Sequence, residues 1–315
     1  MKPKSVRVYA PASISNLGPG FDVLGIAIAK PGDIVVAKRI RQEGLLFAVR
    51  ERSLEVPTDA RNNVAAHVAS LILREFKPPF GIQLELDKRM PIGSGLGSSA
   101  ASSAAAAIAV NALLPKPLKR DELLRFVVEG ERKASGSPHA DNATPSLLGG
   151  AWLIRNYNPL DVISLPIRNA LTWVVVHPHL IVETREARRI LPRSIPLASA
   201  IRQWGNVGGL TAGLITGNTA LIGKCIEDII IEPLRARLIP GFHEVKQAAL
   251  SSGAVACSIS GSGPSMFAVA TSMKSARSIA NAMVRQFKKK AHVECDAYIS
   301  RVNMSGATIL ETKNR

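Results

Sequence analysis

The segment 91–101, which reads Pro-Ile-Gly-Ser-Gly-Leu-Gly-Ser-Ser-Ala-Ala, limits most strongly what this chain can fold into. Its three alternating glycines allow the backbone N–H groups to converge, and an alanine-rich helix pattern follows them to Leu114. A helix that begins near Ser98 presents unpaired N–H groups and the positive end of its dipole to the loop. The segment therefore predicts a cradle for an anion, and a phosphate group is the expected guest.

Other glycine motifs do not account for this loop. No Gly-x-x-x-x-Gly-Lys-Ser/Thr string occurs in the chain, and the similar stretch 217–224 has one residue too many and ends in Cys225. The glycine spacing also differs from that of the dinucleotide fingerprint. A flexible linker is the simpler alternative, but the helical composition of 100–114 argues against it. The sequence indicates a different nucleotide-binding fold.

The length of 315 residues predicts one large or two medium domains, and 4% aromatic residues argue against a stacking surface for single-stranded nucleic acid. Cys225, Cys257 and Cys295 are far apart, which is typical of free thiols in a reducing compartment. The N-terminus has no apolar core of a signal peptide, so we expect a cytoplasmic protein. The uncharged stretch between Arg89 and Lys116 is too weakly apolar to span a membrane.

The formal net charge of +16 makes a basic nucleic-acid-binding protein the alternative from another class. The basic residues are scattered, however, and Lys288–Lys290 is the one short run, on the expected solvent face of a helix. We therefore expect neither nucleic acid nor membrane as a partner, and a basic field that favours acidic ligands such as ATP.

Strand and helix patterns alternate along the chain without repeats, which predicts an α+β fold. We expect the first domain to span 1–160 and the second 161–315, because turn residues occupy 156–159 and each part holds one glycine loop. Strands are expected at 5–10, 33–40, 45–49, 82–86, 152–154, 173–176, 255–259 and 266–270, and helices at 62–76, after the loop, at 120–134, over much of the stretch before 252, and from 274.

Three motifs in order resemble the GHMP kinase superfamily: the strings 11–25, 91–101 and 260–265. Within it the chain most resembles the homoserine kinases, through the strings 135–142, 184–188 and 232–242, and the resemblance extends from about Val6 to Leu310. It implies the two-domain GHMP kinase fold, with a ribosomal-protein-S5-like N-terminal domain and a ferredoxin-like C-terminal domain. It also implies a homodimer.

The implied reaction moves the γ-phosphoryl group of ATP to the side-chain hydroxyl of L-homoserine, giving O-phospho-L-homoserine in threonine biosynthesis. Related enzymes that phosphorylate mevalonate-pathway intermediates or shikimate are the enzymatic alternative, but their substrates carry no ammonium group for Asp22. The resemblance assigns ATP binding to Pro91, Ile92, Gly93, Ser94, Gly95, Leu96, Gly97, Ser98, Ser99, Ala100, Ala101, Asn63, Gly261 and Gly263. Asn63 is equally well explained as a helix N-cap, and the last two glycines as a tight turn between strands.

The resemblance further implies that Mg²⁺ is held by Ser99 and Glu131, with Ser98 and Glu129 as adjacent alternatives. Substrate binding falls to seven residues: Asn16, Asp22, His139, Asn142, Thr184, Arg188 and Arg235. Two arginines suit a carboxylate and an aspartate suits an ammonium group, although Arg185 and Arg237 are close enough in sequence to replace the named arginines.

The catalytic residues expected near the attacking hydroxyl are Asn142 and Asp141. Because an asparagine cannot accept a proton as a general base, we expect Asn142 to orient the hydroxyl and the proton to leave late, to phosphate or water. A role for Asp141 as the base stays open.

Overall fold

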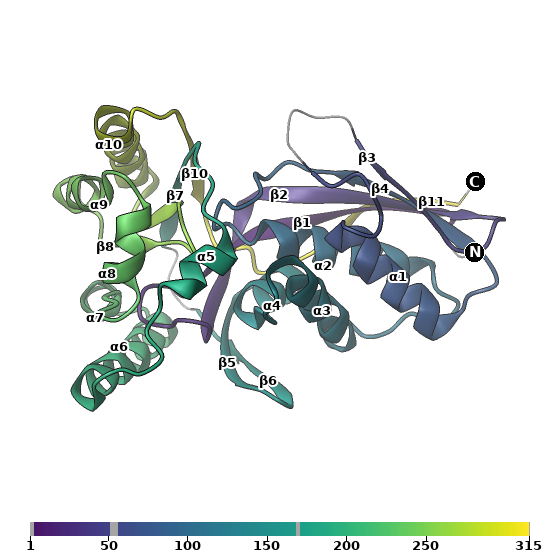
Figure 1. Ribbon diagram of the computed structural model, residues 1–315, viewed down its shortest axis with the longest axis horizontal. Helices are drawn as coiled ribbons and strands as arrows, with labels where there is room; N and C mark the ends of the chain where they lie inside the picture. The colour runs from purple at the N-terminus through teal and green to yellow at the C-terminus, as the bar shows by residue number, and fades with distance from the viewer. Residues whose placement is uncertain (1–2, 51–55, 168–170, 315) are drawn as a thin grey trace.

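The computed structural model describes residues 3–50, 56–167 and 171–314, which form two α+β halves side by side (Figure 1). The first half contains a seven-stranded sheet whose central path runs β11-β1-β2-β4-β3, with β5 attached to β2 and β6 to β5. Its strands are β1 (Ser5–Ser15), β2 (Leu24–Ile40), β3 (Leu45–Val49), β4 (Gly81–Asp87), β5 (Ala151–Tyr157), β6 (Leu160–Leu165) and β11 (Thr308–Lys313).

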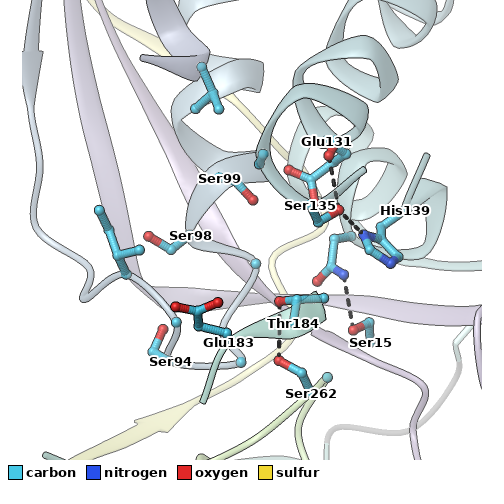
Figure 2. A pocket seen from close by; sticks show the side chains of 18 of the residues that line it. Ser15, Ser94, Ser98, Ser99, Glu131, Ser135, His139, Glu183, Thr184 and Ser262 are labelled. Carbon is cyan, nitrogen blue, oxygen red and sulfur yellow. Dashed lines mark hydrogen bonds between the residues drawn. The ribbon is translucent and has the colours of Figure 1, made fainter. Parts of the chain in front are cut away.

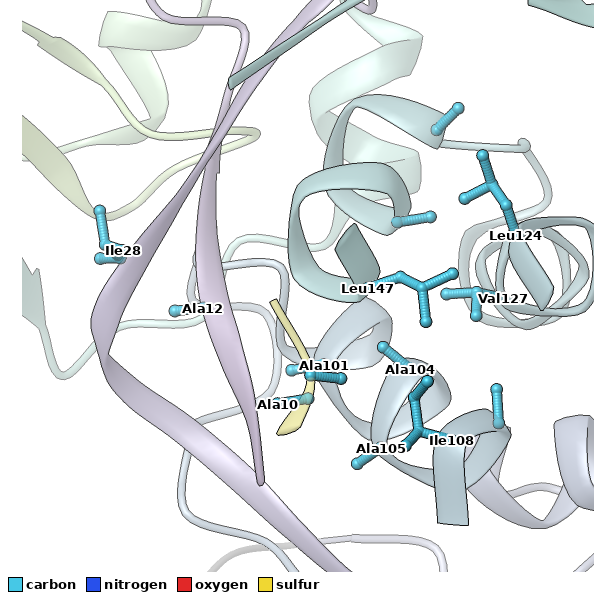
Figure 3. Close-up of a cluster of buried hydrophobic side chains, with 14 of the residues drawn as sticks. Ala10, Ala12, Ile28, Ala101, Ala104, Ala105, Ile108, Leu124, Val127 and Leu147 are labelled. Atoms are coloured by element: carbon cyan, nitrogen blue, oxygen red, sulfur yellow. The ribbon is translucent and has the colours of Figure 1, made fainter. Parts of the chain in front are cut away.

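Four helices cover one face of this sheet: α1 (Val64–Phe76), α2 (Ser98–Leu113), α3 (Leu124–Ser135) and α4 (Ala140–Leu148). The alanine-rich helix α2 lies between β1 and β2 on one side and α3 and α4 on the other (Figure 3). Ala101 and Ala105 face the strands, and Ala104 and Ile108 face Leu147. A helix that is apolar all round is buried, and its small side chains allow close packing against the sheet. This packing fixes the start of α2 at the phosphate loop.

The second half has four antiparallel strands in the order β10-β7-β9-β8. They are β7 (Thr172–Pro178), β8 (Ala256–Ile259), β9 (Met266–Ala270) and β10 (Cys295–Ser300), and the helices of this half are α5 (Thr184–Arg189), α6 (Leu197–Thr216), α7 (Thr219–Cys225), α8 (Glu232–Arg235), α9 (Phe242–Ser251) and α10 (Met273–Ala291). One helical stretch separates β7 from β8, and α10 separates β9 from β10. This β-α-β-β-α-β order is the expected ferredoxin-like arrangement.

Both faces of the second sheet are covered. Val174 and Val176 point toward a core formed with α9 and α10, whereas Trp173 and Val175 belong to the core shared with α6, α7 and the first half. A strand buried on both faces reads as a continuous apolar run rather than an alternating one. This explains why 173–176 was recognisable as a strand from its sequence.

The structure differs from the sequence expectations at several elements. β2 begins at Leu24 rather than at 33, because its first part pairs with β5 and its second part with β4. The strands β6, β10 and β11 and the helix α4 were not expected. β11, near the C-terminus, returns to pair with β1 of the first sheet, so a division of the chain at residue 160 remains a proposal.

The cysteines and the helices can be compared with what the sequence predicted about free thiols and membrane spans. Cys225, Cys257 and Cys295 are free thiols, as their spacing predicted. Within the described ranges, no helix is both long and apolar enough to cross a lipid bilayer.

Candidate active site

A cavity of about 560 Å³ opens where the two halves meet. Its walls come from the β1–β2 loop, the phosphate loop, α3, the start of α4, α5, and the turn between β8 and β9 (Figure 2). Every residue expected to bind substrate lines this cavity: Asn16, Asp22, His139, Asn142, Thr184, Arg188 and Arg235. The structure thus brings together side chains that are more than 200 positions apart in the chain.

The phosphate loop has the backbone that its glycines predicted. Gly93, Gly95 and Gly97 have φ angles of 66°, 75° and 65°, in the left-handed region that favours glycine. Gly97 is the N-cap of α2, and no described side chain caps that helix, so its first-turn N–H groups are available to a ligand. This arrangement is a ready anion site.

Not all of the loop faces the cavity. Ile92, Gly93, Ser94, Gly95, Gly97, Ser98 and Ser99 line it. Leu96 and Ala101 are instead fully buried in the hydrophobic core, and Pro91 and Ala100 also lie outside the lining. For these four residues, any part in ATP binding is confined to shaping the loop and to the backbone.

The turn between β8 and β9 holds the phosphate loop from the other half. Ser260 Oγ donates a 2.7 Å hydrogen bond to the carbonyl of Gly95, and a Cβ at Gly95 would lie 2.4 Å from the Ser260 carbonyl. Gly261 lines the cavity, but Gly263 packs against Ile239 and does not. The tight-turn interpretation therefore fits Gly263, and of these two glycines Gly261 lies in the expected cavity wall.

A buried ion pair below the loop was missed by the sequence analysis. Lys88 Nζ contacts the carboxylate of Asp33 and donates hydrogen bonds to the Ser98 carbonyl at 2.8 Å and to Ser102 Oγ at 2.9 Å. The same carboxylate accepts the backbone N–H of Met90 at 3.1 Å. Lys88 and Asp33 therefore join β2, the end of β4 and the first turn of α2, and Lys88 also lines the cavity.

Glu131 on α3 faces the first turn of α2. Burial raises the pKa of its carboxyl group to about 7, and the neighbouring Ser99 hydroxyl and Lys88 charge offset this only in part. The oxygen Oε1 is buried and has no partner among the described residues. Glu129, by contrast, is exposed and pairs with Arg132 at 3.1 Å, so the geometry favours Glu131 over Glu129.

This pair fits a divalent cation. A buried carboxylate oxygen without a partner, next to a serine hydroxyl and an open anion cradle, offers the few oxygen ligands that Mg²⁺ takes from proteins when phosphate supplies the rest. No group of three or more His, Cys, Asp or Glu that could hold a metal occurs among the described residues, so a site built by protein ligands alone is not found there.

Asp22 and Arg188 form an ion pair at the substrate end of the cavity. Arg188 Nη2 lies 2.9 Å and 2.8 Å from the two carboxylate oxygens. Arg188 Nε is buried without a partner among the described residues, so one donor of the guanidinium is available to an acidic ligand. Arg185 also lines the cavity but is exposed, and Arg237 is exposed and does not line it.

Arg235 completes a basic corner and is almost completely buried. Its Nη1 donates a 2.8 Å hydrogen bond to the Gly261 carbonyl, and burial lowers its pKa to about 10, which leaves it charged at neutral pH. The Phe21 ring centroid lies 5.0 Å from Cζ of Arg235 and 5.3 Å from Cζ of Arg188. Phe21 was not singled out from the sequence, although it precedes Asp22 in the first motif.

His139 is held in one tautomer. Its Nε2 lies 3.0 Å from Arg188 Nη2, and an arginine can only donate, so Nε2 accepts and the proton is on Nδ1. Nδ1 donates to Ser135 Oγ at 2.9 Å, and Ser135 donates to the Glu131 carbonyl at 3.0 Å (Figure 2). Burial lowers the His139 pKa to about 4, so the ring is neutral near pH 7.

Asn16 and Thr184 shape the same end of the cavity. The Asn16 side chain donates to the Gly261 carbonyl at 2.8 Å and accepts the backbone N–H of Asp22 at 3.0 Å. Thr184 begins α5, and its hydroxyl lies 3.4 Å from that of Ser262. The bond from Asn16 to Gly261 links the two halves beside the ion pair.

Asn142 and Asp141 lie in the first turn of α4 and differ in their surroundings. Asn142 accepts a 2.8 Å hydrogen bond from Ser13 and donates one of 3.0 Å to Ser15, so both ends of its amide are fixed. Asp141 is buried, its Oδ1 has no described partner, and burial raises its pKa well above the usual range.

Asn63 has the capping role that the sequence allowed. Its side chain accepts the backbone N–H of Ala65 at 2.9 Å and donates to the Pro57 carbonyl at 2.9 Å, at the start of α1. It also lines the cavity. Capping and ligand contact are compatible at this position.

Comparison with known proteins gives one family for the whole chain. The family models described as "GHMP kinases N terminal domain" and "GHMP kinases C terminal" match residues 63–150 and 210–290. A homoserine kinase of Chlorobium phaeovibrioides is 46% identical over 319 aligned residues, which cover 98% of this chain and 100% of that protein. A homoserine kinase of Chloroherpeton thalassium is 46% identical over 318 residues, with the same coverage. The crystal structure of homoserine kinase from Cytophaga hutchinsonii superposes with a TM-score of 0.93 at 46% identity and covers 98% of both chains.

Proposed function

This chain belongs to the homoserine kinases of the GHMP kinase family, and from this we propose how its cavity divides between two substrates. The enzyme transfers a phosphoryl group from ATP to the side-chain hydroxyl of homoserine. The phosphates of ATP lie on the phosphate loop and the amino acid lies beside the ion pair. The observation that carries this division is that Asp22, Arg188 and Arg235 line the same cavity as the anion cradle, since together they match a zwitterion.

In this proposal the substrate carboxylate is bound by Arg188 and Arg235. Arg188 Nε, buried without a described partner, gains an acceptor when the carboxylate enters, which relieves the cost of an unpaired donor. Asp22 receives the ammonium group, and Phe21 keeps the two guanidinium groups in place. The side chain of the substrate then extends toward Asn142 and the start of α2.

Phosphoryl transfer needs mainly positioning and charge neutralisation. The hydroxyl oxygen forms a bond to the γ-phosphorus, the bond from that phosphorus to the β–γ bridging oxygen breaks, and ADP leaves. The first-turn N–H groups of α2 and Lys88, which lies beneath them, offset the negative charge on the phosphates. Asn142 orients the attacking hydroxyl, and the proton leaves to phosphate or water.

We also propose Mg²⁺ as the metal of the reaction, held by Ser99 and Glu131. When bound, the ion would neutralise charge on the phosphates. Ser99 and Glu131 both line the cavity, and the buried Oε1 of Glu131 has no described partner, which supports this choice of residues.

Three further features belong to the same proposal. The product enters threonine biosynthesis, and the reaction takes place in the cytoplasm, where free thiols such as Cys257 are stable. The resemblance also implies a homodimer, which light scattering on the purified protein would test.

A coupled assay of ADP release with Mg-ATP tests the substrate assignment. The acceptors are L-homoserine, D-homoserine, L-threonine, L-serine, mevalonate and shikimate. Turnover confined to L-homoserine is the expected result, because it alone presents the ammonium, the carboxylate and a hydroxyl of the right reach in the L configuration. Rapid turnover of mevalonate or shikimate would contradict the assignment of Asp22 to an ammonium group.

A further inference from the structure

Tyr157 is the last residue of β5 and lies behind Asp22, which lines the substrate end of the cavity. Its hydroxyl donates a 2.6 Å hydrogen bond to the backbone carbonyl of Asp22, 135 positions away. Tyr157 is half-buried against the hydrophobic core and does not line the cavity. Its influence on a ligand must therefore pass through Asp22.

The backbone at Asp22 needs such support. Asp22 has a φ of 60°, in the left-handed region that non-glycine residues seldom adopt, and Asn16 and Leu17 in the same loop have φ angles of 68° and 47°. The Asp22 N–H is bound by the Asn16 side chain at 3.0 Å, and its carbonyl by Tyr157. Both polar groups of the Asp22 main chain are thus fixed by side chains, and the direction of its carboxylate is fixed with them.

The hydroxyl of Tyr157 also lies at the start of α4. Burial, together with the nearby charges of Asp141 and Asp22, raises its pKa. Tyr157 stays protonated and remains a donor throughout the range in which the enzyme works. The hydroxyl therefore fixes the loop that carries Asp22 at a point close to the start of α4.

We propose that Tyr157 is a positioning residue that sets recognition of the α-ammonium group, by fixing the main chain of Asp22 so that its carboxylate faces the substrate. This inference rests on the proposed function, in which Asp22 binds that group. Without the hydroxyl, the left-handed residue can rotate and its carboxylate leaves the position opposite Arg188.

The test compares Tyr157→Phe with the native enzyme on two ligands. We measure kcat/KM for L-homoserine and the inhibition constant of 4-hydroxybutanoate, which is homoserine without its ammonium group. Phenylalanine preserves the ring, so the fold is expected to persist. Both constants are taken on the same preparation, and kcat/KM is referred to the concentration of ATP-binding sites found by equilibrium titration with ATP, so that loss of folded protein does not alter the comparison.

The chain offers a matched control in Tyr9. Its hydroxyl donates to two backbone carbonyls, of Ala29 at 2.7 Å and Pro31 at 3.0 Å, and Tyr9 does not line the cavity. Tyr9→Phe removes a comparable hydrogen bond from the same half of the protein. It is expected to leave both constants within about twofold of the native values.

For Tyr157→Phe we expect kcat/KM for L-homoserine to fall about tenfold while the inhibition constant of 4-hydroxybutanoate changes less than about twofold. An equal loss for both ligands, or no loss for either, would overturn the role of Tyr157. If the native enzyme does not phosphorylate L-homoserine at all, the proposed function itself fails, which is a different result.

Discussion

The carboxylate of Asp22 and the guanidinium of Arg188 neutralise each other at 2.8 Å across the substrate end of the cavity. The side chains are 28% and 35% exposed, respectively, so solvent screens the pair and its contribution to stability is small, on the order of 1 kcal/mol or less. The pair is therefore better explained by binding than by folding. Each partner holds the other in place until a zwitterion arrives.

Asp22→Asn separates these two roles. We expect KM for L-homoserine to rise about 100-fold, because an ionic hydrogen bond to the ammonium group is replaced by a neutral amide. The free energy of unfolding should change by less than about 1 kcal/mol. Steady-state kinetics and urea unfolding measure the two quantities.

Asp161→Asn is the control for that variant, since Asp161 pairs with Arg155 on the surface and does not line the cavity. It should leave KM unchanged. An Asp22→Asn enzyme with native KM would exclude Asp22 from the ammonium site.

Gly95→Ala should disable the phosphate loop. The new Cβ would lie 2.4 Å from the Ser260 carbonyl and 2.8 Å from that of Gly263, and a φ of 75° disfavours any side chain. Since backbone atoms of the other half cannot move aside cheaply, we expect KM for ATP to rise by at least about tenfold.

Gly44→Ala isolates the backbone cost alone, because Gly44 has a φ of 97° but nothing within 4 Å of its Cβ position. It should lower stability by about 1–2 kcal/mol and leave KM for ATP unchanged.

Stability should depend on pH through Glu131. Burial raises its folded-state pKa from the ordinary 4.5 to about 7, so between these values the folded state binds more protons than the unfolded state. Its contribution therefore falls as pH rises from about 4.5 to 7 and is constant above, a loss of about 3 kcal/mol. We expect Glu131→Gln to remove this part of the slope, as measured by urea unfolding at several pH values, while the part due to Asp141, whose pKa burial also raises, remains. Glu129→Gln, at an exposed ion pair, should keep it. An identical slope in all three proteins would show that Glu131 does not carry the buried charge.

The parts of the site that were predictable from sequence are those determined locally. The phosphate loop follows from glycine spacing and the helix after it, and Asn63 caps α1 as its position allowed. Where neighbours competed, helix geometry separates them: Glu129 and Glu131 are two positions apart on α3, so they lie on opposite faces and only one reaches the cavity. Arg235 and Arg237 are also two positions apart, and Arg235 lines the cavity whereas Arg237 does not.

The parts that were missed depend on contacts between distant segments. Lys88 pairs with Asp33 across 55 positions and Tyr157 reaches Asp22 across 135, and neither residue stands out from its neighbours in the sequence. Helix α4 was missed because its short sequence contains Pro145 and several small polar residues, which give it little intrinsic helix propensity. Its burial against the first sheet stabilises it instead.

The roles of Asp141 and Asn142 can be separated by one substitution at each. Burial raises the pKa of Asp141 well above its usual range, which favours the neutral acid over the carboxylate. Asparagine is close in shape to that neutral acid. We therefore expect Asp141→Asn to retain turnover within about threefold of the native value, as measured by kcat at saturating substrates. A fall of kcat by about 100-fold or more would identify Asp141 as the proton acceptor.

Asn142→Ala, unlike Asp141→Asn, should lower kcat strongly. Its amide is fixed between Ser13 and Ser15, and its Oδ1 would lie 2.8 Å from a Cβ at Gly97, so it faces the point where the phosphate loop becomes α2. Without this amide the attacking hydroxyl is no longer aligned with the phosphate, and we expect kcat to fall by about 10–100-fold. KM for ATP should stay within about twofold, because the cradle itself is intact. A rise in KM for ATP with unchanged kcat would instead place Asn142 among the residues that shape the nucleotide site.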